Sequence, residues 1–326
     1  MKHFFTKLDN FINQSQNIVL SAHERPDGDA LGALLGLSYH LEERGKQVVC
    51  FVNDPPPAYF NFLDTQKIIN DKEIISNLNY DLVIFLDIGD VKRSYLSSLL
   101  SNNANKPIVL SIDHHPTILE YRGNKIVHEY LINPEASSTS EIIYHFLKHI
   151  NAPISRPMAT SLLTGILTDT GGFSNLATTT SSIDAAAKLL GQGALLQEIT
   201  DRTLKNKTLP ILKVWGVALS RLQKDPKTGI VSTAIFLKDL EDCGADLGAI
   251  DGIANFLNYL QDATAALLLK ELPDGLINGS YRTTTPGVDV SEMAAQFGGG
   301  GHAKSAGFTV PGRIEQTPSG WQVVSA

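Results

Sequence analysis

The sequence predicts an α/β fold in which a parallel sheet carries helices on both faces and is followed by a second, smaller α/β domain. In the first half of the chain, short apolar runs typical of strands alternate with longer stretches of helical periodicity. Two of these runs, Asp81–Asp87 (DLVIFLD) and Ile108–Ile112, are apolar on both faces, as buried parallel strands are. The turn-forming segment Lys224–Gly229 then separates this half from a second group of strands and helices.

The elements of the first half follow from periodicity and from helix end signals. The expected order is a helix over 4–12, a strand over 18–22, a helix over about 30–44, strands over 48–52, 81–87 and 108–112, and helices over 141–150, 158–168, 182–190 and 210–222. Gly45 is a natural stop for the second helix. Gly28, Gly32 and Gly36 are spaced by four, which predicts close helix packing rather than a dinucleotide fingerprint.

The second half reads as strands over 230–236, 263–271 and 277–282, with a helical stretch near 250–260. Asp289 and Glu292 resemble a capping box that starts a helix ending at Phe297. We therefore expect three regions: a catalytic domain over 1–190, a helical linker over 191–224 and a substrate-binding domain over 225–326, with a cleft between the two domains.

Composition limits the classes of function. The net charge of the 326 residues is 27 − 34 = −7, whereas proteins that bind long duplex nucleic acid are usually basic. The longest apolar runs reach five residues, so we expect no membrane-spanning helix, and the N-terminus lacks the apolar stretch of a secretory signal. Only Cys50 and Cys243 occur, which favours a reducing cytoplasm, and a homodimer is compatible with the sequence.

Acidic and histidine side chains follow the predicted strands and helices at four places. They are His23 with Asp27 and Asp29, then Asp87, then Asp113-His114-His115, and finally Asp169. Ligands of open parallel sheets gather at the carboxyl ends of the strands, so these groups should converge. A lone aspartate after a strand is usually a cap or turn residue, but four such positions together favour a shared site.

Four carboxylates in one pocket, those of Asp27, Asp29, Asp87 and Asp169, would repel one another, and two divalent cations would cancel their charge. Oxygen-rich ligation with some imidazole and no thiolate indicates Mn²⁺, with Mg²⁺ as the alternative. Asp87, alone after its strand, is the candidate bridge between two ions that would clamp the attacking and leaving oxygens of a displacement at phosphorus. His115 could contact the phosphate or the leaving group, and Asp113 could orient an imidazole. We count Asp113 and His115 as the catalytic candidates.

The segments HERPDGDALG, FLDIGD, SIDHHP and ILTDTGGF, in this order, resemble the four motifs of the DHH phosphoesterase superfamily. The resemblance covers about residues 15–180 and implies a site for two Mn²⁺ ions. Carried over position by position, it implies that one ion is held by His23, Asp27 and Asp87, and the other by Asp29, Asp87, His114 and Asp169.

A glycine-rich segment follows the last predicted helix and includes Gly299, Gly300, Gly301 and His302. Such glycines let the backbone approach an anion, although a plain loop is the common explanation for a glycine-rich segment. The segment resembles the GGGHxxAAG element of the DHHA1 domain, and GSYR resembles the strand that carries its arginine, here Arg282. These residues are our candidates for substrate binding.

The combination of the two domains is similar to NrnA-type oligoribonucleases, which implies hydrolysis of very short RNA to mononucleotides. We expect a short oligonucleotide or nucleotide phosphate as substrate, no long duplex and no membrane. The alternatives are a 3′-phosphatase for adenosine 3′,5′-bisphosphate, a linear or cyclic dinucleotide phosphodiesterase, a pyrophosphatase, and a nucleotide-sensing module without turnover.

Overall fold

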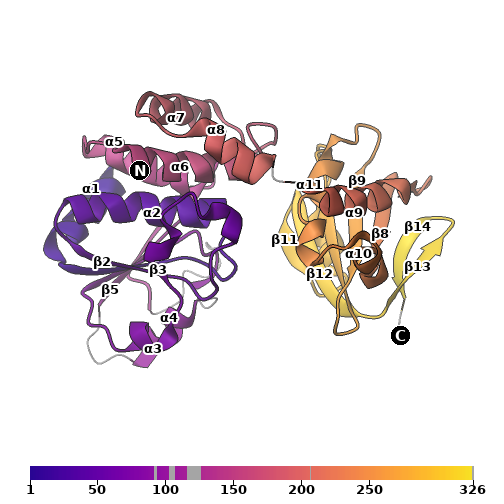
Figure 1. Ribbon diagram of the computed structural model, residues 1–326, viewed down its shortest axis with the longest axis horizontal. Helices are drawn as coiled ribbons and strands as arrows, with labels where there is room; N and C mark the ends of the chain where they lie inside the picture. Colours follow the sequence, from indigo (N-terminus) through magenta and orange to yellow (C-terminus); the bar gives the residue numbers. More distant parts are fainter. Residues whose placement is uncertain (92–93, 103–106, 116–125, 206, 325–326) are drawn as a thin grey trace. The chain divides into compact units, whose positions relative to one another are not determined.

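The computed structural model describes residues 1–91, 94–102, 107–115, 126–205 and 207–324. Internal contacts divide the chain into two compact units, Met1–Asn206 and Lys207–Ala326 (Figure 1). The predicted linker, 191–224, contains elements of both units: helix α8 (Leu196–Ile199) belongs to the first and helix α9 (Leu209–Ser220) to the second. In the described ranges, each helix is too short or too polar to cross a bilayer.

The first unit is built on a six-stranded sheet whose neighbouring strands all pair in parallel, as predicted. The strand order β3-β2-β1-β4-β5-β6 reverses between β1 and β4, and ligands of such sheets bind at this reversal, outside the carboxyl ends. The strands are β1 (Asn17–Ser21), β2 (Gln47–Phe51), β3 (Ile68–Ile69), β4 (Leu82–Leu86), β5 (Ile108–Asp113) and β6 (Glu129–Ile132).

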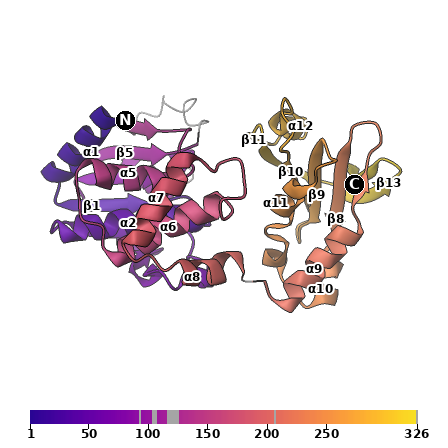
Figure 2. The same ribbon diagram turned by 90° about the horizontal axis from the view of Figure 1, so that it is seen from above.

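Helices cover both faces of this sheet, which confirms the predicted layers (Figure 1), and Figure 2 looks onto the face covered by α2, α6 and α7. One apolar core joins the sheet to α1, α2, α5 and α6, and a second core on the opposite face includes Ile75 of α3 and Leu96 of α4. The helices are α1 (Lys2–Gln14), α2 (Gly28–Glu43), α3 (Lys72–Ser76), α4 (Tyr95–Asn102), α5 (Thr139–His149), α6 (Arg156–Asp169), α7 (Thr180–Gly191) and α8, with short 3₁₀ turns at Ala58–Phe60 and Thr65–Lys67 and a π-helical turn at Thr200–Leu204.

Helices α2 and α6 approach each other closely because glycines line their contact. A Cβ atom added to Gly28, Gly32 or Gly36 would lie 2.3, 2.5 or 2.6 Å from an atom of α6. Non-bonded heavy atoms do not come this near, so a larger side chain at these positions would push the helices apart. The predicted packing role of the three glycines is therefore confirmed, and it brings the end of α6 to the start of α2.

The second unit contains a mixed sheet of strand order β11-β12-β10-β9-β8-β7, in which only the β8–β9 pair is parallel among the described strands. The strands are β7 (Gln223–Lys224), β8 (Ile230–Ile235), β9 (Ala265–Glu271), β10 (Leu276–Arg282), β11 (Gly300–His302) and β12 (Ser305–Pro311), and β13 (Arg313–Thr317) pairs with β14 (Gly320–Val324) in a separate hairpin. The helices are α9, α10 (Leu237–Cys243), α11 (Ile253–Phe256) and α12 (Val290–Ala295), with 3₁₀ turns at Leu247–Ile250 and Leu257–Tyr259.

One expectation for the second unit is confirmed and another needs correction. The helical stretch near 250–260 is α11 continued by the 3₁₀ turn Leu257–Tyr259, and Gly252, in a left-handed conformation (φ +91°), separates it from the 3₁₀ turn Leu247–Ile250. The glycine-rich segment, expected to be a loop, contributes edge strand β11, which pairs with β12. The predicted cap at Asp289 is confirmed, since its side chain accepts a hydrogen bond from the backbone N–H of Ser291 at the start of α12.

Candidate metal centre

The candidate ligands of the first unit gather at the carboxyl ends of β1, β4 and β5, at the reversal of strand order. His23 follows β1, Asp87 follows β4 directly, and Asp113 is the last residue of β5. Because β1 pairs with β4 and β4 with β5, all three strand ends lie at one edge of the sheet. The structure therefore brings together the groups that the sequence places far apart.

The segment between β1 and α2 folds back on itself to bring His23 to Asp27. The Oδ1 atom of Asp27 accepts hydrogen bonds from the backbone N–H groups of Asp29 (3.0 Å) and Ala30 (3.1 Å), so Asp27 is the N-cap of α2. This cap explains why α2 starts at Gly28, two residues before the predicted start. His23 lies with Nδ1 2.7 Å from the carbonyl oxygen of Glu24 and with Nε2 3.8 Å from Asp27 Oδ1. In the neutral ring, donation by Nδ1–H leaves the Nε2 lone pair on the side of the carboxylates.

Asp87 is the central group of the cluster. Its side chain is buried and its backbone adopts a left-handed conformation (φ +54°) immediately after β4. Oδ2 lies 3.8 Å from His23 Nε2, and Oδ1 lies 3.7 Å from His114 Nε2 and 3.4 Å from His115 Nδ1. One carboxylate thus faces three imidazoles, one on one oxygen and two on the other.

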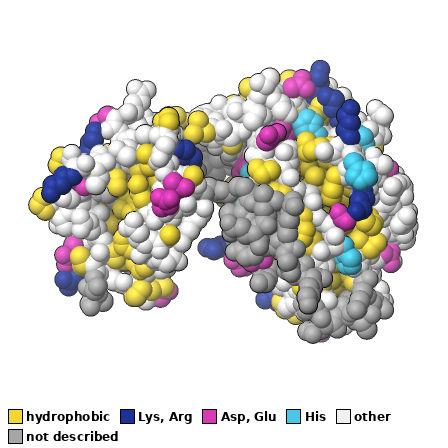
Figure 3. Space-filling view, turned by 180° about the vertical axis from the view of Figure 1, so that it is seen from behind, with side chains coloured by type: hydrophobic (Ala, Val, Ile, Leu, Met, Phe, Trp, Pro, Cys, Tyr) yellow, Lys and Arg dark blue, Asp and Glu magenta, His cyan; other side chains and the backbone are white. Residues whose placement is uncertain are grey.

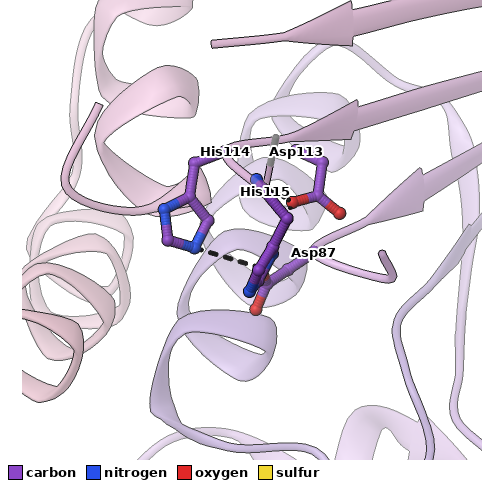
Figure 4. A group of neighbouring side chains, drawn as sticks. All are labelled: Asp87, Asp113, His114 and His115. Carbon is purple, nitrogen blue, oxygen red and sulfur yellow. Dashed lines mark hydrogen bonds and ion pairs between the residues drawn. The ribbon is translucent and has the colours of Figure 1, made fainter. Parts of the chain in front are cut away.

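The Asp113-His114-His115 turn places its two imidazoles differently (Figure 4). Asp113 Oδ1 accepts hydrogen bonds from the backbone N–H (2.8 Å) and Nδ1 (2.7 Å) of His115, and Oδ2 accepts one from the backbone N–H of Gly89 (2.8 Å). Asp113 therefore orients His115. His114 instead lies with Nε2 3.3 Å from Asp169 Oδ2 and bonds to the backbone of Ala136.

Asp29 and Asp169 complete the cluster from two helix ends. Asp29 is the second residue of α2 and is 1% exposed, and Asp169 is the last residue of α6. Both oxygens of Asp29 accept backbone hydrogen bonds at the start of α5: Oδ2 from Thr139 (2.6 Å) and Oδ1 from Ser140 (2.8 Å). The carbonyl oxygen of Asp169 accepts a hydrogen bond from Asn175 Nδ2 (2.7 Å), which fixes the loop after α6.

Burial and mutual repulsion raise the pKa values of three carboxyl groups, those of Asp29, Asp87 and Asp169. Burial raises the pKa of Asp29 to about 7, with help from the charges of Asp87 and Asp27. Burial and the neighbouring aspartates also raise the pKa of Asp87 and, more strongly, that of Asp169. A cation in this pocket would therefore favour the charged forms of these three carboxyl groups.

The pKa values of two imidazoles in the pocket are raised as well. Burial lowers the pKa of His23, but the hydrogen bond and charge of Asp27 outweigh burial and raise it to about 9. Burial likewise lowers the pKa of His115, whereas its hydrogen bonds to Asp113 and Asp87 raise it to about 11. Both raised pKa values indicate that the neighbouring carboxylates favour positive charge in this pocket, either a proton on a ring or a bound cation.

The donor set fits divalent cations. Within each of three groups the donor atoms lie within 4.8 Å of one another, and the groups are His23, Asp27 and Asp87; Asp29, His114 and Asp169; and Asp87, Asp113, His114 and His115. Carboxylate oxygen with imidazole nitrogen and no thiolate suits Mn²⁺ or Mg²⁺. The group of His23, Asp27 and Asp87 is the same as the ligand set predicted for one ion. The group of Asp29, His114 and Asp169 is the set predicted for the other ion without Asp87, and Asp87 Oδ1 lies 3.7 Å from His114 Nε2.

In the second unit, strand register places Arg282 beside the glycine-rich strand. Arg282 pairs with Ser305, and Ser305 pairs with His302, so these positions form a row across β10, β12 and β11. The side chain of His302 lies outside the described part of the structure. The guanidinium of Arg282 donates from Nε to Asn255 Oδ1 (2.8 Å) and from Nη1 to the carbonyl of Tyr281 (2.8 Å), so its orientation is fixed.

The three predicted substrate-binding glycines differ in what surrounds them. A Cβ at Gly299 would lie 2.2 Å from the carbonyl oxygen of Gly307, and one at Gly301 would lie 2.6 Å from that of Ser305. At Gly300 no described atom lies within 4 Å of an added Cβ. Packing therefore explains Gly299 and Gly301, whereas Gly300 faces open space on the row of Gly307 and Ser280, two rows from that of Arg282.

Sequence reasoning missed two residues that hold candidate site residues in place. Thr139 contacts two candidate metal ligands, and Asn255 contacts the candidate substrate-binding residue Arg282. Thr139 donates its hydroxyl to Asp87 Oδ1 (3.2 Å) and its N–H to Asp29, and Asn255 holds Arg282. The run Ser137-Ser138-Thr139-Ser140 before an apolar helix is a recognisable N-cap signal. For Asn255 the sequence offers no comparable signal, because its contact depends on the packing of α11 against β10.

Comparison with known proteins identifies two family domains in the chain. Residues 17–166 match the model described as DHH family, N-terminal domain, and residues 228–323 match that of the DHHA1 domain. The chain is 30% identical over 298 residues to the bifunctional oligoribonuclease and PAP phosphatase NrnA of Thermus thermophilus, and the match covers 90% of this chain and 84% of that protein.

Two further similarities are more distant. The chain is 25% identical to the cyclic-di-AMP phosphodiesterase PdeA of Listeria monocytogenes, with 92% of this chain matched to 45% of that protein. The crystal structure of an exopolyphosphatase-related protein from Bacteroides fragilis shares the fold with a TM-score of 0.87 at 23% identity, covering 96% of this chain and 92% of that one. The two matched domains and the relative from Thermus confirm the predicted resemblance: the chain belongs to the DHH family, as a member whose DHH domain is followed by a DHHA1 domain.

Proposed function

We propose that this phosphoric ester hydrolase uses two Mn²⁺ ions to hydrolyse short oligonucleotides, including dinucleotides, to mononucleotides. The observation that carries the proposal is the position of Asp87, whose two oxygens face His23 on one side and His114 on the other. Such a carboxylate can belong to two ligand sets at once. The names of the relatives, which include an oligoribonuclease, support the same substrate class.

In this proposal His23, Asp27 and Asp87 hold one ion, and Asp29, Asp87, His114 and Asp169 hold the other. The chemistry that such a pair of ions supplies is to clamp the attacking and leaving oxygens of an in-line displacement at phosphorus and to ease deprotonation of the attacking water. Mg²⁺ would satisfy the same oxygen donors, but the imidazoles favour Mn²⁺.

We assign His115 to the substrate rather than to an ion. Asp113 accepts a hydrogen bond from Nδ1 of the ring at 2.7 Å, and this bond helps to raise the pKa of His115. A protonated imidazole beside Asp87 can donate a hydrogen bond to a phosphate oxygen or protonate the leaving group. Asp113 acts through His115 and is a positioning residue.

The second unit supplies substrate binding through Arg282, the backbone at Gly299, Gly300 and Gly301, and His302. A guanidinium held by Asn255 is ready to meet a phosphate without a loss of side-chain freedom. Basic and acidic side chains are interspersed on the face of both units shown in Figure 3. That distribution supports a short substrate, which needs few phosphate contacts.

A second candidate activity is removal of the 3′-phosphate of adenosine 3′,5′-bisphosphate, since the relative from Thermus is named for both activities. The relative from Listeria suggests cyclic di-AMP as a third substrate, although this chain spans only 45% of that protein. A sensing module without turnover would not need all six proposed ligands, and all six are present. We place the enzyme in the cytoplasm, because its two cysteines are unpaired in the structure.

The test is a substrate panel. Purified protein is incubated with Mn²⁺, with Mg²⁺ or with a chelator, and with 5′-labelled oligonucleotides of two to twenty units, adenosine 3′,5′-bisphosphate, cyclic di-AMP and pyrophosphate. We expect Mn²⁺-dependent release of mononucleotides that is fastest for the shortest oligonucleotides. Asp87→Ala should abolish hydrolysis, whereas Asp184→Ala on the exposed surface of α7 should not change it. Undiminished turnover by folded Asp87→Ala protein would refute the bridging role.

A further inference from the structure

The first turn of α5 lies directly against two of the proposed ligands. Ser138 caps this helix by accepting a hydrogen bond from the backbone N–H of Glu141 (3.0 Å), and the helix begins at Thr139. Thr139 and Ser140 are fully buried. Their backbone N–H groups belong to the first turn, where a helix has unpaired donors and a positive end of its dipole.

Thr139 and Ser140 direct three hydrogen bonds at two carboxylates. Their N–H groups bind one oxygen each of Asp29, at 2.6 and 2.8 Å, so this carboxylate cannot rotate without breaking both bonds. The hydroxyl of Thr139 donates to Asp87 Oδ1 at 3.2 Å. Thr139 is therefore joined to both carboxylates, through its backbone to one and through its side chain to the other.

The surrounding structure keeps this turn from moving. A Cβ at Gly165 of α6 would lie 2.0 Å from Ser140 Oγ and 2.6 Å from Asp29 Oδ1, so α6 packs directly on the pair. On the other side, Glu141 Oε2 accepts a hydrogen bond from the backbone N–H of Ser137 (2.7 Å), and Oε1 accepts one from the Ser181 hydroxyl of α7 (2.5 Å). The turn is held by two helices besides its own.

We propose that Thr139 is a positioning residue that fixes the separation of Asp29 and Asp87 and thereby sets the distance between the two cations; this inference rests on the metal site proposed above. Two buried carboxylates repel each other, and a pair of hydrogen-bond donors on one residue holds them at a set spacing before any cation arrives. Donors behind metal ligands of this kind commonly change metal affinity by about 10–100-fold.

The plain alternative is that Thr139 only stabilises the start of α5. The two roles predict different measurements. A structural residue would, when changed, lower the stability of the metal-free protein and leave the affinity of the folded protein for Mn²⁺ unchanged. A positioning residue would lower the affinity for Mn²⁺ while the metal-free protein keeps its stability.

The experiment compares wild type, Thr139→Val, Thr139→Ser and Thr164→Val. Valine has the shape of threonine without its hydroxyl, and serine restores the donor. Thr164 is the matched control, because it is buried in the same unit but donates to Thr160 of its own helix (2.8 Å). Mn²⁺ binding is titrated without substrate by electron paramagnetic resonance of the free ion, and melting temperature is measured with a chelator and with Mn²⁺.

We expect Thr139→Val to bind Mn²⁺ about 10–100-fold more weakly than wild type, with Thr139→Ser close to wild type and Thr164→Val unchanged. In chelator, Thr139→Val and Thr164→Val should melt at similar temperatures. Wild-type affinity in folded Thr139→Val protein would overturn the inference alone, whereas failure of the wild type to bind Mn²⁺ would overturn the metal site itself. Thr139→Ala replaces Thr139→Val in the comparison should the valine variant not fold.

Discussion

Replacement of Gly165 by alanine tests the packing behind the candidate metal centre. The added Cβ would lie 2.6 Å from Asp29 Oδ1 and 2.0 Å from Ser140 Oγ, well inside van der Waals contact. Ser140 Oγ can rotate away, but Asp29 Oδ1 is held by the Ser140 N–H at 2.8 Å, so the strain falls on that hydrogen bond.

The size of the effect follows from three contributions. Overpacking in a well-packed interior costs about 1–3 kcal/mol. Loss of a hydrogen bond to a charged group costs about 1.5–3 kcal/mol. Alanine in place of glycine within a helix returns about 1 kcal/mol. We therefore expect Gly165→Ala to lower the free energy of unfolding of the first unit by about 1.5–5 kcal/mol.

The assay is urea denaturation in chelator, followed by far-ultraviolet circular dichroism. Both tryptophans of the chain, Trp215 and Trp321, belong to the second unit, so their fluorescence reports that unit separately. Gly191 in α7 is the matched control, because no described atom lies within 4 Å of an added Cβ there, and Gly191→Ala should leave stability unchanged or raise it by up to about 1 kcal/mol. A circular dichroism transition of Gly165→Ala that coincides with that of wild type would refute the packing argument.

Three further results are expected. Arg282→Ala should raise KM for a dinucleotide far more than it slows hydrolysis of an aryl phosphoester, and equal losses on both substrates would contradict phosphate binding by the second unit. Gly300→Ala should raise the same KM while leaving the melting temperature unchanged, whereas Gly299→Ala should lower the melting temperature because its Cβ meets a carbonyl oxygen at 2.2 Å. Burial raises the pKa of Glu141, but hydrogen bonds involving His145, Ser181 and Ser137 outweigh this and lower it from 4.5 to about 2. The charged form therefore stabilises the fold above pH 4.5, and this contribution disappears as the pH falls towards 2. Urea denaturation from pH 6 to pH 2 should show a steeper loss of stability for wild type than for Glu141→Gln, and parallel curves would contradict the role of this carboxylate.

The convergence of the candidate ligands could be predicted because it depends on topology. A strand that is apolar on both faces indicates a parallel sheet. The residues that follow neighbouring strands of such a sheet lie together at one edge. Asp87 follows a strand of this kind and Asp113 ends another, so the sequence predicts that the two residues lie near each other. The long helix α2 was predictable for a different reason, because its apolar residues repeat at helical spacing.

The parts that could not be predicted depend on tertiary contacts. Strand β3 has two residues and α3 has five, so neither shows a periodicity that a sequence reveals. The division of the stretch near 250–260 depends on the backbone conformation of Gly252. Thr139 and Asn255 carry no chemical signature, since their importance comes from the atoms that packing places opposite them.

The candidate ligands also bear on the order of folding. His23 and Asp169 lie 146 residues apart in sequence (169 − 23), and the remaining ligands are spread between them. Contacts of such high sequence separation form late, after the entropy of closing large loops has been overcome. A cation that needs these side chains together binds the finished domain and not its fragments, and ligands of this kind stabilise the native state in proportion to the logarithm of their concentration. For the proposed two-cation site, the supply of divalent cation would thus act on how much folded protein persists as well as on turnover.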